Sequence, residues 1–368
     1  MAIRHLLDLD AVPVREIYEI LSMARSIMKK PDYFCDSCHA KVMATLFYEP
    51  STRTQMSFQA AMLRLGGKVV GFDNPQSSSV SKGESLKDTV RVVSNYADIL
   101  AIRHPSEGAA KAASMFSRVP LINAGDGGHL HPTQTLTDVF TLLETKGTLE
   151  GLKIGLCGDL KNGRTVHSLI KTMSRFAGNH FVLISRPELT VPAYIKSLMD
   201  DAGRTWSECA DLAEAIGDID VLYMTRIQRE RFASEEEYQA QKGVFILDMQ
   251  KLKRAKYGLK ILHPLPRVDE IAVEVDDDPR AVYFQQSEFG MYARMSLILH
   301  MLDGCTKAVD PRPDANSQLV CKNPRCVTHT EPYLPKLFTT ENGKLICEYC
   351  EADAPGKSSL IKQTAPIL

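Results

Sequence analysis

The residues best suited to chemistry lie in polar loops that follow short apolar runs. Residues 51–54, Ser-Thr-Arg-Thr, follow such a run and open a stretch with helical spacing. A helix start exposes unpaired N–H groups and the positive end of the helix dipole, and the Arg53 guanidinium matches phosphate oxygens. The pattern predicts an anion site, although an N-capped helix with one unrelated arginine would look the same.

Other loops add cations and donors. Residues 77–84 carry three consecutive serines and Lys82, which could close over a phosphate or could belong to an ordinary solvated loop. Arg103 follows an apolar run, and Arg164 ends a polar loop that begins at residue 158. In doubly wound folds, loops after the strands form the ligand crevice.

Two arrangements depend on backbone geometry. Arg226 and Gln228 lie two positions apart, so in extended backbone their side chains point the same way. Pro132 suits the first position of a helix, which places His131 at the helix start, where the dipole disfavours the imidazolium. A neutral imidazole there could donate a hydrogen bond to a carbonyl. A single histidine is more often structural, but the adjoining glycine-rich loop favours function.

The loops contain no recognisable nucleophile–base pair and no G-x-S-x-G elbow. The loop at 158–164 also lacks the G-x-G-x-x-G pattern of a dinucleotide site. What remains is a site rich in arginine, which suits anionic substrates and catalysis by positioning and electrostatics.

Alternating apolar runs and helical patterns must position these loops, and they predict an α/β fold with two doubly wound parallel-sheet domains. In the first region we expect strands at 42–48, 68–72, 98–103 and 119–124, and helices at 52–65 and 133–144. In the second we expect strands at 153–158, 180–184, 220–224, 244–248 and 260–262, and helices at 164–176 and 291–302.

Composition restricts the function classes. The 368 residues carry a net charge of −1 and are 44% hydrophobic, so no global field favours nucleic acid or a membrane surface. No apolar run approaches a membrane span, and the first residues lack the apolar core of a signal peptide. A cytoplasmic protein with neither nucleic-acid nor membrane partners is expected.

The C-terminal region has the spacing of a zinc site. Its four cysteines are Cys321, Cys326, Cys347 and Cys350. Four thiolates would hold one structural zinc and leave no open position for catalysis; free thiols or disulfides are the alternative. The close pair Cys35 and Cys38 lacks two further ligands nearby, so we do not expect metal there.

Four segments together resemble the transcarbamoylase family. They are Phe-Tyr-Glu-Pro-Ser-Thr-Arg-Thr at 47–54, His-Pro-Thr-Gln at 131–134, Gly-Asp-Leu-Lys-Asn-Gly-Arg-Thr-Val-His-Ser at 158–168, and His-Pro-Leu-Pro-Arg-Val-Asp-Glu-Ile at 263–271. The ornithine-specific branch usually has His-Pro-Cys-Gln and His-Cys-Leu-Pro, so the resemblance is to the aspartate-specific branch. It covers roughly residues 1–306 and implies carbamoyl transfer from carbamoyl phosphate to aspartate, an early step of pyrimidine biosynthesis.

The resemblance implies a role for each site residue. The phosphate would be held by Ser51, Thr52, Arg53 and Thr54. The carbamoyl oxygen would be polarised by Thr54, Arg103 and His131, and the carbamoyl amine oriented by Gln134 and the backbone of Leu265 and Pro266, which would be joined by a cis bond. The aspartate carboxylates would be bound by Arg164, Arg226 and Gln228. No catalytic cofactor would be needed.

The resemblance also implies an assembly. Lys82 and Ser78 would enter a neighbouring subunit's site and contact the substrates there, giving a homotrimer with shared active sites. The domains would be a carbamoyl-phosphate domain at 1–132 completed by a helix at 289–306, an aspartate domain at 133–288, a linker at 307–318, a zinc domain at 319–353 and a tail at 354–368. Residues 320–332 resemble the zinc domain of the family's regulatory chain, which favours a role in subunit packing and leaves a higher assembly open.

Three other interpretations remain open. Transfer could go to another amine such as ornithine, although Arg226 and Gln228 favour a diacid. A zinc-ribbon nucleic-acid binder would need a basic face, whereas the cysteine-rich segment mixes lysines with Glu331, Glu341 and Glu348. An inactive scaffold with zinc would be favoured by the loss of an arginine or histidine of the site, and none is lost.

Overall fold

The computed structural model describes residues 5–226, 245–303, 319–341 and 344–353. The chain divides into two compact units, each described below by itself. Unit 1 comprises residues 1–7, 35–130 and 298–368, and unit 2 comprises residues 8–34 and 131–297. Within the described ranges, no helix has both the length and the apolar character needed to cross a bilayer.

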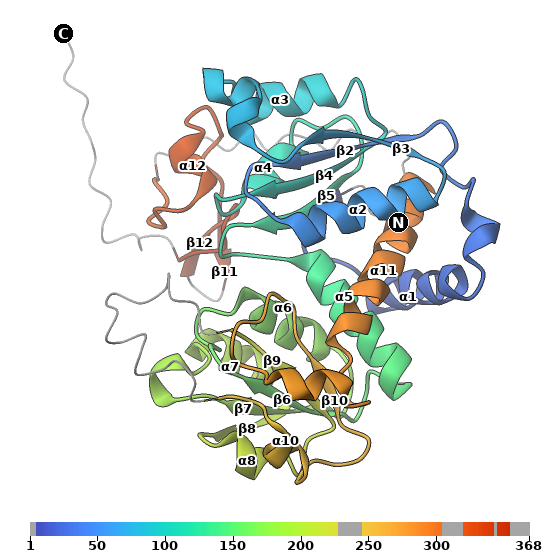
Figure 1. The fold of residues 1–368 in the computed structure, drawn as a ribbon. Coiled ribbons are helices and arrows are strands. Elements are labelled where there is room, and N and C mark those ends of the chain that lie inside the picture. Colours follow the sequence, from blue (N-terminus) through green and yellow to red (C-terminus); the bar gives the residue numbers. More distant parts are fainter. Residues whose placement is uncertain (1–4, 227–244, 304–318, 342–343, 354–368) are drawn as a thin grey trace. The chain divides into compact units, whose positions relative to one another are not determined.

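Unit 1 is built on a five-stranded parallel sheet with the order β1-β5-β4-β2-β3 (Figure 1). Its strands are β1 (His5–Leu6), β2 (Val42–Phe47), β3 (Lys68–Phe72), β4 (Ile99–His104) and β5 (Leu121–Asp126). The helices that accompany them are α2 (Thr52–Arg64), α3 (Leu86–Val93) and α4 (Ala109–Ser114), with 3-10 turns at Pro75–Ser77 and Ser79–Lys82. Strand β2 is buried along nearly its whole length, as expected for a strand covered on both faces.

Helix α2 buries one side and stops abruptly. Phe58, Ala61 and Met62 are buried at spacings of three and four, so one stripe of the helix faces the sheet. Gly66, just after the helix, has φ +82°, and a Cβ there would lie 2.4 Å from the Cys35 carbonyl oxygen. Only glycine fits that position, which returns the chain directly into β3.

Unit 2 repeats the architecture with the strand order β10-β9-β6-β7-β8, again parallel throughout. Its strands are β6 (Lys153–Cys157), β7 (His180–Ile184), β8 (Thr205–Cys209), β9 (Val221–Met224) and β10 (Lys260–Leu262). Its helices are α1 (Val14–Lys29), α5 (Pro132–Lys146), α6 (Arg164–Met173), α7 (Ala193–Asp201), α8 (Leu212–Ala215), α10 (Met249–Leu252) and α11 (Tyr283–Asp303), the last continuing into unit 1 after Leu297. Short 3-10 turns lie at Pro31–Phe34, Pro187–Leu189 and Val273–Asp277.

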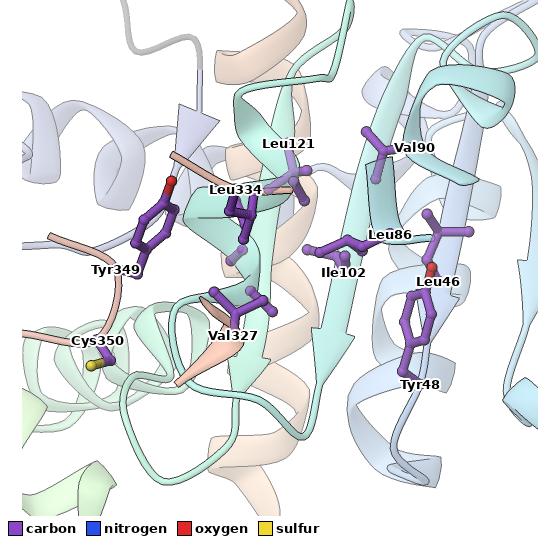
Figure 2. Packing of buried hydrophobic residues seen from close by; sticks show 14 of the residues in the cluster. Leu46, Tyr48, Leu86, Val90, Ile102, Leu121, Val327, Leu334, Tyr349 and Cys350 are labelled. Atoms are coloured by element: carbon purple, nitrogen blue, oxygen red, sulfur yellow. The ribbon is translucent and has the colours of Figure 1, made fainter. Parts of the chain in front are cut away.

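The cysteine-rich segment belongs to unit 1 and forms a small module, residues 319–353. It contains α12 (Val327–Thr330) and an antiparallel pair, β11 (Phe338–Glu341) and β12 (Lys344–Cys347). Figure 2 shows Val327, Leu334 and Tyr349 of the module packed with side chains of the unit 1 sheet and its helices. The module thus shares one apolar core with unit 1.

The predicted α/β class with two parallel sheets is confirmed. The strand expected at 244–248 is wrong over its described residues: Leu247 makes one isolated bridge, to Ile271, and Asp248 instead caps α10, its carboxylate accepting from Lys251 N–H at 2.8 Å. The linker and tail lie outside the described residues, and the domain boundaries stay a prediction.

Candidate functional site

In unit 1 the candidate residues meet where the strand order reverses. Strand β2 has β3 on one side and β4 on the other, so the loops after β2 and β4 diverge at the carboxyl ends of these strands. Phe47 pairs with Arg103, and the Tyr48 N–H donates to the Arg103 carbonyl oxygen at 2.8 Å. This register brings the start of α2 and the Arg103 side chain to one edge of the sheet.

The start of α2 presents donors at that edge. The first intrahelical bond runs from Gln55 N–H to the Ser51 carbonyl oxygen at 3.0 Å, so the preceding N–H groups are available to a ligand. The Ser51 side chain does not cap the helix; its hydroxyl donates to Thr54 Oγ1 at 3.1 Å. Thr52 and Arg53 are exposed. An uncapped helix start flanked by hydroxyls and a guanidinium is suited to a phosphate.

Arg103 is buried and already oriented. Its guanidinium donates to the Ala124 carbonyl oxygen at 3.3 Å and forms an ion pair with Glu49. Glu49 is not among the predicted site residues, although it lies inside the motif at 47–54. A carboxylate holding one edge of the guanidinium fixes the direction in which the remaining N–H groups point.

Ser78 lies between the two 3-10 turns that follow β3, and Lys82 is the last residue of the second turn. The Ser78 hydroxyl donates to the Pro75 carbonyl oxygen at 2.8 Å and accepts from Val80 N–H at 3.3 Å. Lys82 is exposed at the end of the second turn. The two residues therefore lie on a segment separate from the start of α2, and within the single chain they are not brought to Arg103 by any described contact.

Unit 2 has a second reversal point, at β6, which lies between β9 and β7. Gly158 ends β6 with φ +118°, and a Cβ there would lie 2.4 Å from the Thr225 carbonyl oxygen. Thr225 N–H in turn donates to the Cys157 carbonyl oxygen at 2.8 Å. Arg164, the first residue of α6, and half-buried Arg226, which follows Thr225, therefore lie beyond the carboxyl ends of β6 and β9, at the same edge of the sheet. Gln228 lies outside the described residues.

His131 and Gln134 lie at the start of α5, as predicted. His131 is the buried residue before the helix, with Pro132 in the first helical position. The Gln134 side chain donates to Asp138 at 2.7 Å. The carboxyl end of β10 leads to the loop of Leu265 and Pro266, and the cis bond predicted between these two residues is confirmed.

The four cysteines of the C-terminal module form one buried cluster. Their sulfur atoms all lie within 4.8 Å of one another, with Cys321–Cys350 at 3.6 Å and Cys326–Cys347 at 3.9 Å. Tetrahedral zinc with Zn–S bonds of about 2.3 Å separates the sulfurs by about 3.8 Å. Burial raises the pKa of the Cys321 thiol and the neighbouring sulfurs add to the effect, so four thiolates here require a cation. The donor set therefore fits zinc.

Hydrogen bonds and a close backbone approach fix this module to the rest of unit 1. Glu107 N–H donates to the Arg325 carbonyl oxygen at 2.8 Å, and the Asn323 amide donates to the Glu107 carboxylate at 2.6 Å. Gly108 has φ +83°, and a Cβ there would lie 2.5 Å from the Tyr349 carbonyl oxygen. Only glycine allows so close an approach.

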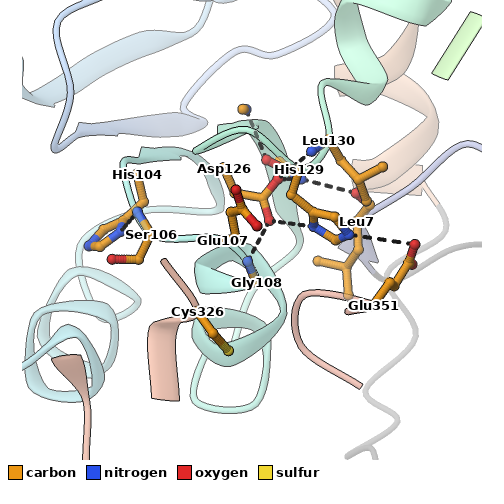
Figure 3. A network of polar contacts seen from close by, with 12 residues as sticks. Leu7, His104, Ser106, Glu107, Gly108, Asp126, His129, Leu130, Cys326 and Glu351 are labelled. Carbon is orange, nitrogen blue, oxygen red and sulfur yellow. Dashed lines mark hydrogen bonds and ion pairs between the residues drawn. The ribbon is translucent and has the colours of Figure 1, made fainter. Parts of the chain in front are cut away.

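His129, on the loop after β5, connects that loop to the C-terminal module (Figure 3). Asp126 accepts from Gly108 N–H at 2.9 Å and from Leu130 N–H at 3.1 Å, and its carboxylate lies 3.2 Å from His129 Nδ1. The other ring nitrogen of His129 lies 3.5 Å from the Glu351 carboxylate of the module. Burial opposes the imidazolium, but the two carboxylates prevail and raise the pKa of His129 to about 10.

We expect this imidazolium to make module docking dependent on pH. Because the folded pKa lies above the ordinary 6.5, its contribution to stability is complete below pH 6.5 and is lost as pH rises through about 10. The loss in unfolding free energy caused by His129→Gln should therefore be largest at pH 6 and shrink towards pH 10. Denaturant titrations at both values measure it, with exposed His39→Gln as the control; equal losses at the two pH values would contradict the assignment.

Comparison with known proteins covers almost the whole chain. Residues 4–144 match the aspartate/ornithine carbamoyltransferase carbamoyl-P binding domain, and residues 150–301 match the Asp/Orn binding domain of the same family. Residues 315–357 match the aspartate carbamoyltransferase regulatory chain, metal binding domain.

Individual relatives and solved structures agree with the family models. The aspartate carbamoyltransferase catalytic subunits of Clostridium perfringens and Finegoldia magna are 57% and 56% identical, each over 81% of this chain and 98% of the relative. The catalytic subunit of M. jannaschii aspartate transcarbamoylase superposes with a TM-score of 0.78 at 45% identity, over 82% of this chain and 98% of that one. The Trypanosoma cruzi aspartate transcarbamoylase complex with N-(phosphonacetyl)-L-aspartic acid has a TM-score of 0.76 at 37% identity, over 81% and 95%. The chain belongs to the aspartate/ornithine carbamoyltransferase family and carries a metal-binding domain of the regulatory-chain type at its C-terminal end.

Proposed function

We propose that this protein is an aspartate carbamoyltransferase: it transfers the carbamoyl group of carbamoyl phosphate to the amine of L-aspartate, giving N-carbamoyl-L-aspartate and phosphate. The observation that carries the proposal is the match, at 57% identity over 98% of its length, to a relative named aspartate carbamoyltransferase catalytic subunit. Trypanosoma cruzi aspartate transcarbamoylase, of similar fold, has been solved with carbamoyl phosphate and aspartate together.

The residues of unit 1 would bind the anionic end of carbamoyl phosphate. The N–H groups at the start of α2, with the hydroxyls of Ser51 and Thr54 and the guanidinium of Arg53, would hold the phosphate. Arg103, oriented by Glu49, would donate to the carbamoyl oxygen together with Thr54. That oxygen gains negative charge as the carbonyl carbon becomes tetrahedral, so donors fixed in advance lower the barrier.

The residues of unit 2 would bind the second substrate and complete the carbamoyl pocket. Arg164 and Arg226 would bind the two aspartate carboxylates. His131 would also donate to the carbamoyl oxygen, and Gln134 with the loop at Leu265 and Pro266 would orient the carbamoyl amine. The neutral aspartate amine attacks the carbamoyl carbon, the C–O bond to phosphate breaks, and the amine proton is released.

Several finer features are part of the proposal. We propose a homotrimer in which Lys82 and Ser78 complete the site of a neighbouring subunit; Lys82 is exposed in the single chain, which supports this role. We also propose one structural zinc per chain in the four-cysteine cluster, a cytoplasmic location and a place early in pyrimidine biosynthesis.

Phosphate release from carbamoyl phosphate tests the function, with aspartate and ornithine compared at mildly alkaline pH. We expect turnover with aspartate only. Arg226→Ala should lower kcat/KM for aspartate by about 100-fold, because a carboxylate loses its charged partner, whereas exposed Arg254→Ala should have no effect. Turnover with ornithine would overturn the acceptor assignment, and no turnover with either amine from folded, zinc-loaded protein would favour an inactive scaffold.

A further inference from the structure

A buried carboxylate joins three elements of unit 2. Asp138, on α5, is completely buried. Its Oδ1 accepts from Gln134 Nε2 at 2.7 Å and from Gln286 Nε2 at 2.6 Å, and its Oδ2 accepts from the Tyr223 hydroxyl at 2.9 Å. These donors come from α5, α11 and β9, so one side chain connects elements that are far apart in sequence.

The carboxylate decides which way the Gln134 amide points. An ionised carboxylate only accepts hydrogen bonds, so the NH₂ end of Gln134 must face Asp138. The amide oxygen of Gln134 is thereby left at the opposite end as an acceptor. The NH₂ group of a carbamoyl substrate is a donor and needs such an acceptor. Without Asp138 the two amide orientations would be similar in energy, and one of them would present a donor to a donor.

The same logic applies to Gln286 and the loop after β10. Because the NH₂ of Gln286 also faces Asp138, its oxygen is free to accept, and it accepts from His263 N–H at 3.0 Å. His263 Nδ1 accepts from Leu265 N–H at 2.7 Å, and His263 Nε2 lies 2.8 Å from the Glu270 carboxylate. Each hydrogen bond fixes the direction of the next, from the carboxylate to the backbone at Leu265.

Burial and hydrogen bonding act on the charge of Asp138 in opposite directions, and the ionised form predominates above about pH 7. Burial raises the pKa of Asp138 to about 7, while the three donors and the charge of buried Arg294 act in the opposite direction. Replacing this buried acceptor with an apolar side chain would leave its polar donors unsatisfied.

We infer that Asp138 is a positioning residue for the carbamoyl group: it orients the Gln134 amide and, through Gln286 and His263, the loop at Leu265, so that both offer acceptors to the carbamoyl NH₂. The inference rests on the proposed function, in which Gln134 and this loop contact that amine. Asp138 itself touches neither substrate in this scheme.

A matched pair of ligands isolates this role. Phosphonoacetamide carries the NH₂ group, and acetonylphosphonate has a methyl group in its place, with the same phosphonate and carbonyl. Calorimetric titration of the intact zinc-loaded protein gives the preference for the amide over the methyl ketone. We expect Asp138→Leu to lower that preference by about 10-fold or more, the usual effect of leaving a buried NH₂ donor without its acceptor, with acetonylphosphonate affinity unchanged.

Three further variants make the test specific. Asp138→Asn can keep an oxygen at the Oδ1 position, so it should retain most of the preference, and Tyr223→Phe leaves both amide contacts in place and should retain all of it. Asp138→Glu keeps the charge but moves the oxygens, so it should lose the preference even if Asp138→Leu does not fold. An unchanged preference in folded Asp138→Leu or Asp138→Glu would overturn the inference.

The failure of the inference is distinguishable from failure of the proposed function. If the wild-type protein releases phosphate with aspartate while the Asp138 variants keep the ligand preference, only the inference falls. If the wild-type protein neither turns over aspartate nor prefers the amide ligand, the proposed function falls and the inference with it.

Discussion

Removal of the proposed structural zinc is expected to unfold the C-terminal module and to expose part of the unit 1 core. Structural zinc sites in small domains contribute about 10–16 kcal/mol, which is comparable to the whole net stability of a typical domain, about 5–15 kcal/mol. Over its described residues, 319–341 and 344–353, the module has a two-stranded sheet and one short helix, too little to bury an apolar core of its own.

The consequence extends beyond the module because its apolar side chains are shared. Val327, Leu334 and Tyr349 pack in one cluster with Leu86 and Val90 of α3 (Figure 2). When the four thiolates lose their cation, they repel one another, and the side chains that they hold in place separate from α3. We therefore expect the melting temperature of unit 1 to fall and its apolar surface to bind a hydrophobic dye.

Chelation and Cys347→Ser test this expectation, with exposed Cys35→Ser as the matched control. Zinc content, calorimetric melting and dye binding measure the change. The single tryptophan, Trp206 on β8, belongs to unit 2, so its emission should stay constant while dye binding rises. Unchanged melting after complete removal of zinc would mean that apolar packing alone holds the module.

The elements predicted from the sequence are those whose signal is local. Strand β2 is a continuous apolar run followed by polar residues, and α2 ends at glycines, so both were correctly located. Strand β8 was not predicted: among the described strands it pairs only with β7, at the edge of the sheet, and it exposes Thr205 and Glu208, so it lacks a buried apolar run. The pattern at 244–248 misled because a continuous apolar run also fits a buried segment that is not a strand: within its described residues, Leu247 makes a single isolated bridge, to Ile271.

The site residues likewise divide into those that local sequence order predicts and those that depend on distant contacts. Residues 51–54 and Arg164 lie at the starts of the helices that follow β2 and β6, and Arg103 is the second-last residue of β4, so their place at a sheet edge could be predicted from sequence order alone. The contacts of Asp138 could not, because its partners Tyr223 and Gln286 are 85 and 148 positions away. No local pattern in the sequence of α5 shows whether its aspartate is buried or exposed.

The second large effect is expected at Arg103. Arg103→Ala should lower kcat by about 10²–10³-fold, the usual effect of removing one donor from a developing oxyanion. Arg103→Lys keeps a positive charge but loses the planar fork that contacts both Glu49 and Ala124, so we expect it to recover only a small part of the activity. Exposed Arg118→Ala is the matched control within unit 1.

Glu49 separates catalysis from stability in this experiment. Arg103→Ala leaves the Glu49 carboxylate without its guanidinium, so part of any loss in melting temperature comes from that unpaired charge. The double variant Glu49→Gln with Arg103→Ala should regain stability but not kcat. In Glu49→Gln alone, the guanidinium keeps its charge and loses its anchor, so kcat should fall less than in Arg103→Ala. If the double variant recovers both stability and turnover, Arg103 supports the fold and does not act on the carbamoyl oxygen.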